Sequence, residues 1–184
     1  MSKSPHSNRG AESHTRRARR LERPTIRVSG LVQSDDTLLL VRQTRGLKDH
    51  WLLPGGAVEL GETVTEALER EILEECGLCV QADSSPIALV QTISPDAGRT
   101  RHLIHLIFEV RLVDAQGQPL VAPLHAAPGD PAIKELRWVG SDEVQKIDIH
   151  PPIHDLLVSW MQSRASHPAA PIPFVATGPL WAEE

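Results

Sequence analysis

The stretch that decides the fold runs from Gly56 to Leu78 and reads GAVELGETVTEALEREILEECGL. Thr63 and Glu66 have the spacing of a capping box, in which each side chain bonds to the backbone of the other residue, so we expect a helix to begin at Thr63. Gly77 is a natural residue to follow the last helical turn, so this helix should end at Cys76. The segment therefore predicts one helix between two loops.

The predicted helix carries carboxylates on the face that should turn toward the core. At about 100° per residue, Glu71 and Glu75 share this face with apolar residues, namely Val64, Ala67, Leu68 and Leu78. Carboxylates one turn apart repel each other. Glu74 and Glu75 also lie in the last turn, where the helix dipole disfavours negative charge. These unfavourable placements predict a compensating cation, and oxygen ligands without His or Cys at a matching spacing favour Mg²⁺ or Mn²⁺.

Such an ion indicates a reaction class. Mg²⁺ held by few carboxylates completes its shell with water and substrate phosphates, and it can then screen phosphate charge and activate a water nucleophile. Gly55 and Gly56, before the helix, let the backbone approach the ion or a phosphate closely. The residues therefore predict hydrolysis of a phosphoanhydride.

The same segment resembles the Nudix box, G-x5-E-x7-R-E-U-x-E-E-x-G-U, in which U is a bulky aliphatic residue. All nine fixed positions match, at Gly56, Glu62, Arg70, Glu71, Ile72, Glu74, Glu75, Gly77 and Leu78. The preceding WLLPG, residues 51–55, is similar to the usual lead-in. The resemblance implies an α/β (α+β) fold, an α/β/α sandwich with a mixed β-sheet in which the box forms a loop–helix–loop. It also implies hydrolysis of a nucleoside diphosphate linked to another moiety, X.

The resemblance further implies the role of each box residue. Glu71, Glu74 and Glu75 would be the catalytic carboxylates and the Mg²⁺ ligands, with the carbonyl of Gly55 or Gly56 as a further ligand. Arg70 would orient these carboxylates, and Glu62 would pair with Arg70 or bind the metal through water. Glu62 and Gly56 are also expected beside the substrate. The general base is left open between Glu71, Glu75 and an acid outside the box, for which the candidates are Glu109 and Glu135.

Cations outside the box are candidates for contact with phosphate. Arg42 ends a predicted strand and resembles the position of a phosphate-binding arginine in family members; the alternative is an exposed arginine at a strand end. Further loop cations that could meet phosphates, or simply be solvated, are Arg45, Lys48, Arg99 and Arg101.

The rest of the chain predicts a mixed sheet with two further helices. Strands are expected at 26–32, 38–41, 51–53, 87–93, 102–112 and 135–139, the first two as a hairpin, and helices are expected at 141–143 and 152–163. Loops are expected at 44–50, 94–100 and 114–131. We predict a Nudix hydrolase domain at 25–165 and a Pro-rich tail at 166–184 that is extended or disordered unless it packs on a partner.

Composition agrees with one soluble domain and tails. The chain has 184 residues, 40% of them hydrophobic and 23% charged. No apolar run approaches the ~20 residues that span a bilayer, and residues 1–23 contain no apolar stretch typical of a signal peptide. We therefore expect a cytoplasmic protein without a membrane partner. Cys76 and Cys79 are too close together to suggest a disulfide framework.

Charge is unevenly distributed along the chain. Residues 1–30 contain eight Lys or Arg and two acidic residues, a net charge of +6, whereas the remainder carries −11. We expect a disordered basic arm at 1–24. It has no aromatic residue for base stacking, which argues against a nucleic-acid partner. An enzyme acting on capped RNA or RNA 5′ ends stays open, because it would give the arm a role.

Substrate and assembly stay open at this stage. The candidate small-molecule substrates are a nucleoside triphosphate, ADP-ribose or another nucleotide sugar, and a dinucleoside polyphosphate. The alternative of another class is a nucleotide-sensing binding module, although such domains commonly have a damaged box and this one is complete. The Pro-rich tail could also hold a second protomer, which makes a homodimer a further expectation.

Overall fold

A computed structural model describes residues 23–45, 48–96, 99–120, 127–163 and 174–177. The predicted basic arm therefore lies almost entirely outside the described residues, as does most of the Pro-rich tail. In chain order the elements are β1 (Thr25–Ser34), β2 (Thr37–Arg45), β3 (Lys48–Leu52), α1 (Val64–Cys76), β4 (Val80–Ala82), β5 (Ala88–Asp96), β6 (Arg99–Leu112), β7 (Ile133–Gly140), α2 (Ser141–Val144), α3 (His154–Gln162) and β8 (Phe174–Thr177).

The described strands form one mixed sheet. Its strand order is β3-β2-β1-β6-β5-β8, with β7 added on β2 and β4 added on β6. β1 runs parallel to β6 and antiparallel to β2, so it joins the two parts of the sheet. β5 pairs antiparallel with β6 and parallel with β8.

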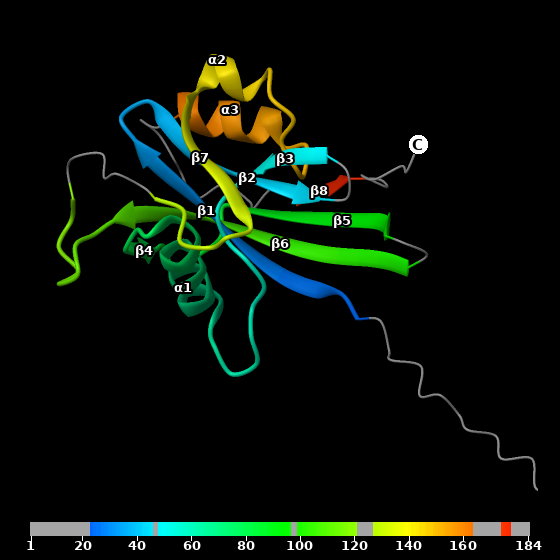
Figure 1. The fold of residues 1–184 in the computed structure, drawn as a ribbon, viewed down its shortest axis with the longest axis horizontal. Coiled ribbons are helices and arrows are strands. Elements are labelled where there is room, and N and C mark those ends of the chain that lie inside the picture. The colour runs from blue at the N-terminus through cyan, green and yellow to red at the C-terminus, as the bar shows by residue number, and fades with distance from the viewer. Residues whose placement is uncertain (1–22, 46–47, 97–98, 121–126, 164–173, 178–184) are drawn as a thin grey trace, which may run out of the picture.

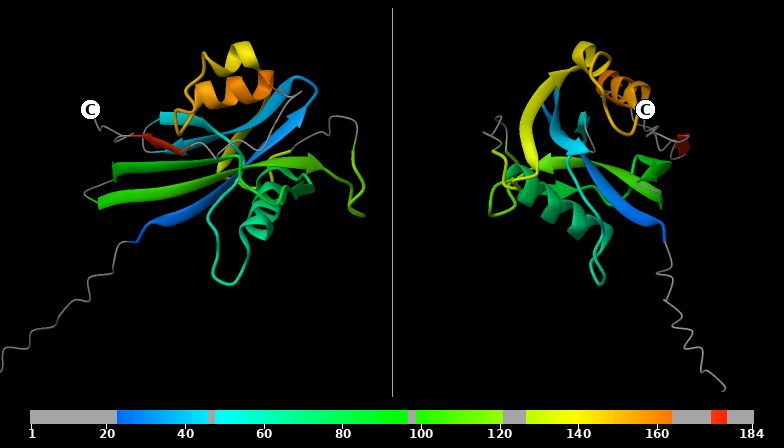
Figure 2. Two further views of the ribbon diagram at one scale, coloured as in Figure 1. Left: turned by 180° about the vertical axis from the view of Figure 1, so that it is seen from behind. Right: turned by 45° about the vertical axis from the view of Figure 1, so that its right-hand side comes forward.

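Helices cover both faces of this sheet, as Figures 1 and 2 show. α1 packs through Ala67, Leu68 and Ile72 on one face, where they meet Val28, Val41 and Phe108. α3 packs on the other face through Leu157 and Trp160, together with Ile153 just before the helix. These side chains lie in one cluster with strand residues such as Leu31 and Ile107. The architecture is the expected α/β/α sandwich with a mixed sheet, so the predicted fold class is confirmed.

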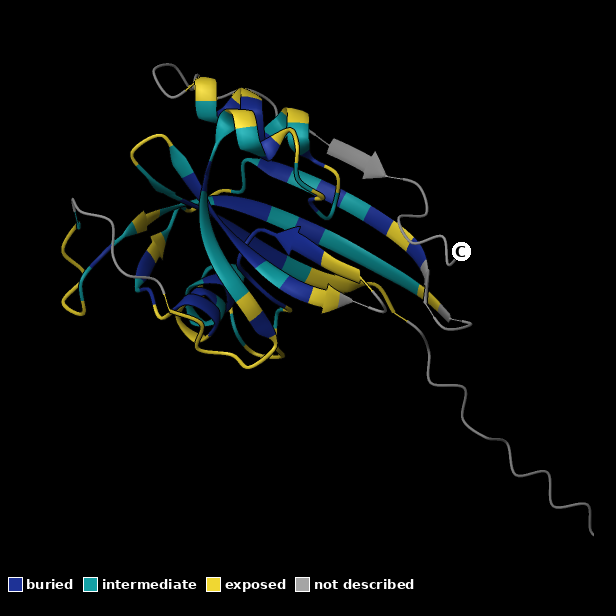
Figure 3. Ribbon diagram, turned by 45° about the horizontal axis from the view of Figure 1, so that its top comes forward, coloured by how far each residue is buried: buried dark blue, intermediate teal, exposed yellow. Residues whose placement is uncertain are grey.

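Burial of β2 follows from this layering. Its residues 38–41, Leu-Leu-Leu-Val, are all fully buried, because both faces of the strand lie under helices. Figure 3 shows the buried residues gathered in the strands between the helical layers. Among the described residues, no helix is long and apolar enough to cross a membrane.

The box helix begins and ends where the sequence predicts. The Thr63 side chain accepts a hydrogen bond from the Glu66 backbone N–H at 3.2 Å, and the Glu66 carboxylate accepts one from the Thr63 N–H at 2.8 Å, which completes a capping box. Gly77 has φ 67° and its N–H donates to the Leu73 carbonyl, as expected of a glycine that ends a helix.

The Gly-rich loop before the helix is bonded along β1. The N–H of Gly30 donates to the Pro54 carbonyl at 2.9 Å, and the N–H of Val28 donates to the Gly56 carbonyl at 2.9 Å. The N–H of Val58 donates in turn to the Ile26 carbonyl at 3.1 Å. Loop 54–58 therefore takes the place of a neighbouring strand where β2 diverges from β1.

Two predicted loops are shorter than expected. The polar loop predicted at 44–50 is wrong, because Thr44 pairs with Asp49 within the β2–β3 hairpin. The loop predicted at 94–100 is wrong for the same reason, since Ser94 pairs with Arg101 between β5 and β6. Backbone pairing extends these strands through residues whose side chains give no apolar alternation.

Other elements depend on pairings between distant segments. β4 was not expected, and it forms by pairing with the end of β6. Residues 174–177, inside the predicted Pro-rich tail, form β8 along the edge of β5. Residues 141–144 and 154–162 are helical, close to the ranges predicted for them.

Candidate active site

Glu75 is a buried carboxylate at the centre of the candidate site. Only 5% of its surface is exposed. Its Oε2 accepts a hydrogen bond from the Gly55 N–H at 2.8 Å, and its Oε1 accepts one from Gln43 Nε2 at 3.0 Å. Burial raises the pKa of Glu75 to about 7, although the Gly55 hydrogen bond and the nearby Arg27 charge lower it, while Glu71 raises it further. The hydrogen bond from Gly55 and the charge of Arg27 therefore compensate the negative charge of Glu75 only in part.

Glu71 lies one helical turn before Glu75 and is held against the Gly-rich loop. A Cβ atom added to Gly56 would lie 2.0 Å from the Glu71 Cδ, so only glycine leaves room for this carboxylate. At Gly55, φ is 139° and an added Cβ would lie 2.2 Å from the Val28 carbonyl oxygen. Gly55 is therefore required by its backbone surroundings, whereas a side chain at position 56 would displace the Glu71 carboxylate.

Arg70 connects the box carboxylates to one another. Its guanidinium donates from Nε and Nη2 to the two oxygens of Glu62, at 3.1 and 2.9 Å. Its Nη1 donates to Glu71 at 3.0 Å and to the more exposed Glu74 at 3.3 Å. The pKa of Glu62 is lowered, chiefly by the hydrogen bonds from Arg70. Arg70 thus fixes the positions of three carboxylates.

The predicted loop at 114–131 contributes to the end of the box helix. The N–H of Ala127 donates to the Cys76 carbonyl at 3.2 Å, and the N–H of Gly129 donates to the Glu75 carbonyl at 3.1 Å. A Cβ atom on Gly129 would lie 2.2 Å from the Glu74 carbonyl oxygen. The loop therefore satisfies carbonyls that the helix end would otherwise leave without partners.

The donor set of this site fits a hard divalent cation. Glu71, Glu74 and Glu75 offer carboxylate oxygens from one end of one helix, and Glu75 carries the charge that a cation would compensate. The Gly55 carbonyl accepts from Arg27 Nη2 and the Gly56 carbonyl accepts from the Val28 N–H. Each carbonyl oxygen has a second lone pair that could serve a ligand.

Two side chains beside Glu75 were missed by the sequence analysis. Gln43 is a buried polar residue near the end of β2 and donates to Glu75. Its place just after the apolar run 38–41 is the feature of the sequence that could have indicated a buried polar side chain. Arg27 has no such signal in the sequence. Burial lowers its pKa, while Glu75 and Glu71 raise it, so these charges lie near one another.

Arg42 lies away from the box carboxylates. Side chains alternate along a strand, so Arg42 points opposite to Gln43. Its guanidinium forms salt bridges with Asp49 at 2.9 Å and Glu135 at 2.8 Å and lies 5.8 Å from the centre of the Trp51 ring. A role for Arg42 in substrate binding stays a prediction that these contacts do not support.

The two acids predicted outside the box have other contacts. Glu109 accepts a hydrogen bond from the Trp160 indole, and Glu135 pairs with Arg42 and Arg137. No described contact joins either acid to a box carboxylate. The choice of general base between Glu71, Glu75 and these two acids stays a prediction.

A second group of ionisable side chains lies between β3 and the segment before α3. His50 Nδ1 lies 3.0 Å from one oxygen of Asp148, and His150 Nε2 lies 2.9 Å from the other. The two imidazole rings are 4.1 Å apart and meet edge to face. Although such a group has the residue types of a metal site, one ring nitrogen of each histidine already lies at hydrogen-bond distance from an oxygen of Asp148.

Comparison with known proteins agrees with this geometry. The NUDIX domain family matches residues 23–161. An ADP-ribose pyrophosphatase of Methanocaldococcus jannaschii is 37% identical over 94 residues, which are 50% of this chain and 54% of that protein, so the match spans about half of each. Phosphatase NudJ of Escherichia coli K12 is 28% identical over 147 residues, covering 79% of this chain and 88% of that protein.

Solved structures show the same fold. A NUDIX hydrolase from Nitrosomonas europaea has a TM-score of 0.61 at 23% identity and covers 84% of this chain and 79% of that one. A MutT protein from Methanosarcina mazei has a TM-score of 0.58 at 22% identity, with 80% and 99% covered. Together with the intact box and the carboxylates that it positions, the match over residues 23–161 shows that this chain belongs to the NUDIX domain family and is a Nudix hydrolase.

Proposed function

We propose that the protein is a Mg²⁺-dependent pyrophosphohydrolase that cleaves a nucleoside diphosphate linked to another moiety. The candidate substrates are nucleoside triphosphates, ADP-ribose or other nucleotide sugars, and dinucleoside polyphosphates. The observation that carries the proposal is the buried Glu75 carboxylate, which Gly55 and Gln43 hold in place one helical turn from Glu71. The Methanocaldococcus relative is an ADP-ribose pyrophosphatase, which supports ADP-ribose as one substrate to test.

The chain's own residues have separate tasks in this proposal. Glu71, Glu74 and Glu75 would hold the cation, for which Mn²⁺ is an alternative to Mg²⁺. Arg70 keeps Glu71 and Glu74 oriented, and Glu62 keeps Arg70 oriented. When bound, the cation would polarise the phosphates and lower the pKa of a bound water. A box glutamate would take a proton from the attacking water as the water oxygen bonds to one phosphorus. The bond from that phosphorus to the bridging oxygen breaks, and the bridging oxygen leaves with the other phosphate product.

The test is release of phosphate or nucleotide from a panel of these substrates in Mg²⁺, Mn²⁺ or EDTA. We expect turnover with a divalent cation and none in EDTA. Mutation of a residue that hydrogen-bonds to a metal ligand lowers activity by about 10- to 100-fold. Glu75→Gln alters a proposed ligand itself, so it should lower kcat by at least about 100-fold. Circular dichroism checks that the variant folds.

Glu69→Gln is the matched control, because Glu69 lies on the same helix at a variable position of the box and is not one of its fixed residues. Its carboxylate accepts a hydrogen bond from the Ala82 N–H at 3.0 Å, which a glutamine carbonyl can replace. Activity of Glu69→Gln should stay near that of the wild type. Full activity of Glu75→Gln contradicts the proposal, and a folded protein that binds nucleotides without any turnover favours the nucleotide-sensing alternative.

A further inference from the structure

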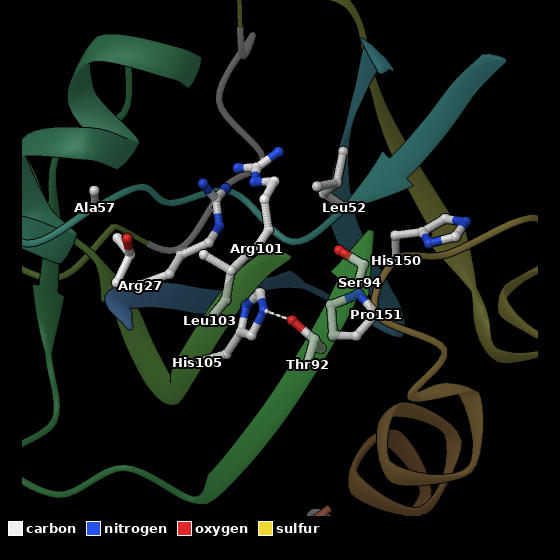
Figure 4. A pocket seen from close by; sticks show the side chains of 11 residues that line it. Arg27, Leu52, Ala57, Thr92, Ser94, Arg101, Leu103, His105, His150 and Pro151 are labelled. Atoms are coloured by element: carbon white, nitrogen blue, oxygen red, sulfur yellow. Dashed lines mark hydrogen bonds between the residues drawn. The ribbon is translucent and has the colours of Figure 1, made fainter. Parts of the chain in front are cut away.

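A cavity of about 100 Å³ lies beside the candidate active site, between β1, β5, β6 and the segment before α3 (Figure 4). We call it the β1–β5 cavity. Its lining residues are Thr25, Arg27, Leu52, Ala57, Thr92, Ser94, Arg101, Leu103, His105, His150 and Pro151. Pockets for drug-sized ligands are usually about 300 Å³ or more, so this volume suits one small group of a substrate.

Strand register explains why these side chains meet. Arg27 of β1 is the register partner of His105 on β6, and Arg101 on β6 is the partner of Ser94 on β5. Because side chains alternate along a strand, every second residue faces the same side. The cavity is accordingly lined by alternate residues of three neighbouring strands: residues 25 and 27 of β1, residues 101, 103 and 105 of β6, and residues 92 and 94 of β5.

The cavity has a positive character. Arg27 and Arg101 extend in the same direction in Figure 4. Burial lowers the pKa of Arg27, the charges of Glu75 and Glu71 raise it, and the nearby Arg101 charge lowers it. Two guanidinium groups near each other repel, and an anion between them removes that cost. None of the described residues that line the cavity is Asp or Glu.

Hydrogen-bonding side chains complete the lining. The Thr92 hydroxyl lies 3.3 Å from His105 Nε2, and both residues are buried, as is Ser94. Hydroxyl and imidazole groups can donate to phosphate oxygens, and the guanidinium groups match phosphate geometry. Buried donors beside two arginines fit a phosphate better than an uncharged sugar.

The cavity adjoins the Gly-rich loop 54–58. Arg27 donates to the Gly55 carbonyl, and the Gly55 N–H donates to Glu75. Ala57, from the same loop, also lines the cavity. A substrate with its diphosphate at the box carboxylates could therefore place a more distant group between the two arginines.

We propose that the β1–β5 cavity binds a phosphate of the substrate that lies away from the cleaved diphosphate. The preferred substrates are then nucleoside diphosphate derivatives that carry such an additional phosphate. This inference rests on the proposed function for its reaction, but binding of phosphate to the cavity can be measured without turnover.

The first test is calorimetric titration of the full chain with inorganic phosphate in EDTA. Wild type should bind phosphate, and Arg101→Gln should bind it about tenfold more weakly, because one charge-assisted contact is lost. Arg111→Gln is the matched control, since Arg111 lies on the same strand but pairs with Asp83 and does not line the cavity. Its phosphate affinity should equal that of the wild type.

The second test identifies the source of the phosphate through a matched pair, ADP-ribose and ADP-ribose 2′-phosphate. Wild type should show the higher kcat/KM for the phosphorylated compound, and Arg101→Gln should lose about tenfold of that preference. Inorganic phosphate should raise KM for the phosphorylated compound and leave kcat unchanged.

The outcomes separate the inference from the proposed function. Phosphate binding that depends on Arg101, without turnover of any compound, would leave the cavity assignment standing and overturn the hydrolase proposal. Turnover with no phosphate binding in EDTA, or with binding unaffected by Arg101→Gln, overturns the cavity assignment. Equal kcat/KM for the two compounds, or an effect of phosphate on kcat instead of KM, overturns the proposal that the phosphate bound in the cavity belongs to the substrate.

Discussion

Arg70 is the residue on which the arrangement of the box carboxylates depends. One planar group contacts all three carboxylates: Nε and Nη2 donate to Glu62, and Nη1 donates to both Glu71 and Glu74, a geometry that the single amine of a lysine cannot reproduce. We predict that Arg70→Lys lowers kcat/KM by about 10- to 100-fold and raises the Mg²⁺ concentration needed for half-maximal rate. Steady-state rates across a Mg²⁺ titration measure both effects.

Arg137 provides the comparison for that substitution, because it also bridges two carboxylates, those of Glu135 and Glu143. Arg137→Lys should leave the Mg²⁺ requirement unchanged. An equal loss in both variants would mean that Arg70 acts through general stability and does not orient metal ligands.

Residue-level prediction succeeds where chemistry is local. Glu71 and Glu75 could be placed on the inner face from helical spacing alone, and Glu75 is indeed buried. Arg27 could not be related to the site, because its approach to Gly55 and to His105 arises only once β1 pairs with loop 54–58 and with β6.

At the scale of the element, the box helix depends on its N-terminal cap. Thr63→Ala removes the acceptor for the Glu66 N–H, and such substitutions cost about 0.5 to 2 kcal/mol of unfolding free energy. We predict a loss in this range, measured by urea denaturation. Ser159→Ala, at an exposed position inside α3, should change stability by less than about 0.5 kcal/mol. Similar values for the two variants would show that the cap has no special part in stability.

Elements were predictable where both ends carry local signals. Thr63, Glu66 and Gly77 define the box helix, and turn residues at 34–36 separate β1 from β2. β8 has no such signal, because residues 174–177 become a strand only by pairing with the edge of β5. Pairing between distant segments decides such elements, and a single sequence does not reveal it.

At the scale of the whole molecule, stability should depend on pH through His150. Burial lowers its pKa below the usual 6.5, against the opposing charge of Asp148, and His50 and His154 lower it further. The folded state therefore favours neutral His150. Its contribution to stability is complete above about pH 6.5, the unfolded value, and is lost as pH falls toward the lower folded value.

We accordingly predict that His150 contributes a loss of unfolding free energy as pH decreases below about 6.5, and that His150→Gln removes this contribution from the slope. Glu75, whose folded pKa is raised to about 7, contributes a gain over the same range in both proteins, so it cancels in the comparison of wild type with variant. Urea denaturation at a series of pH values gives the slope. His102→Gln, which replaces a histidine beside Gln91 on the sheet, is the comparison variant. A slope unchanged by His150→Gln, or changed equally by both variants, would exclude His150 as the group responsible.

The pairing of loop 54–58 with β1 has a consequence for preorganisation. Backbone bonds from Val28, Gly30 and Val58 fix this loop as part of the sheet, and the loop supplies the Gly55 N–H that holds Glu75. The conformational entropy of ordering the loop is therefore lost when the sheet forms and not again at each encounter with a substrate. Binding and reaction can then proceed against a backbone that needs little reorganisation.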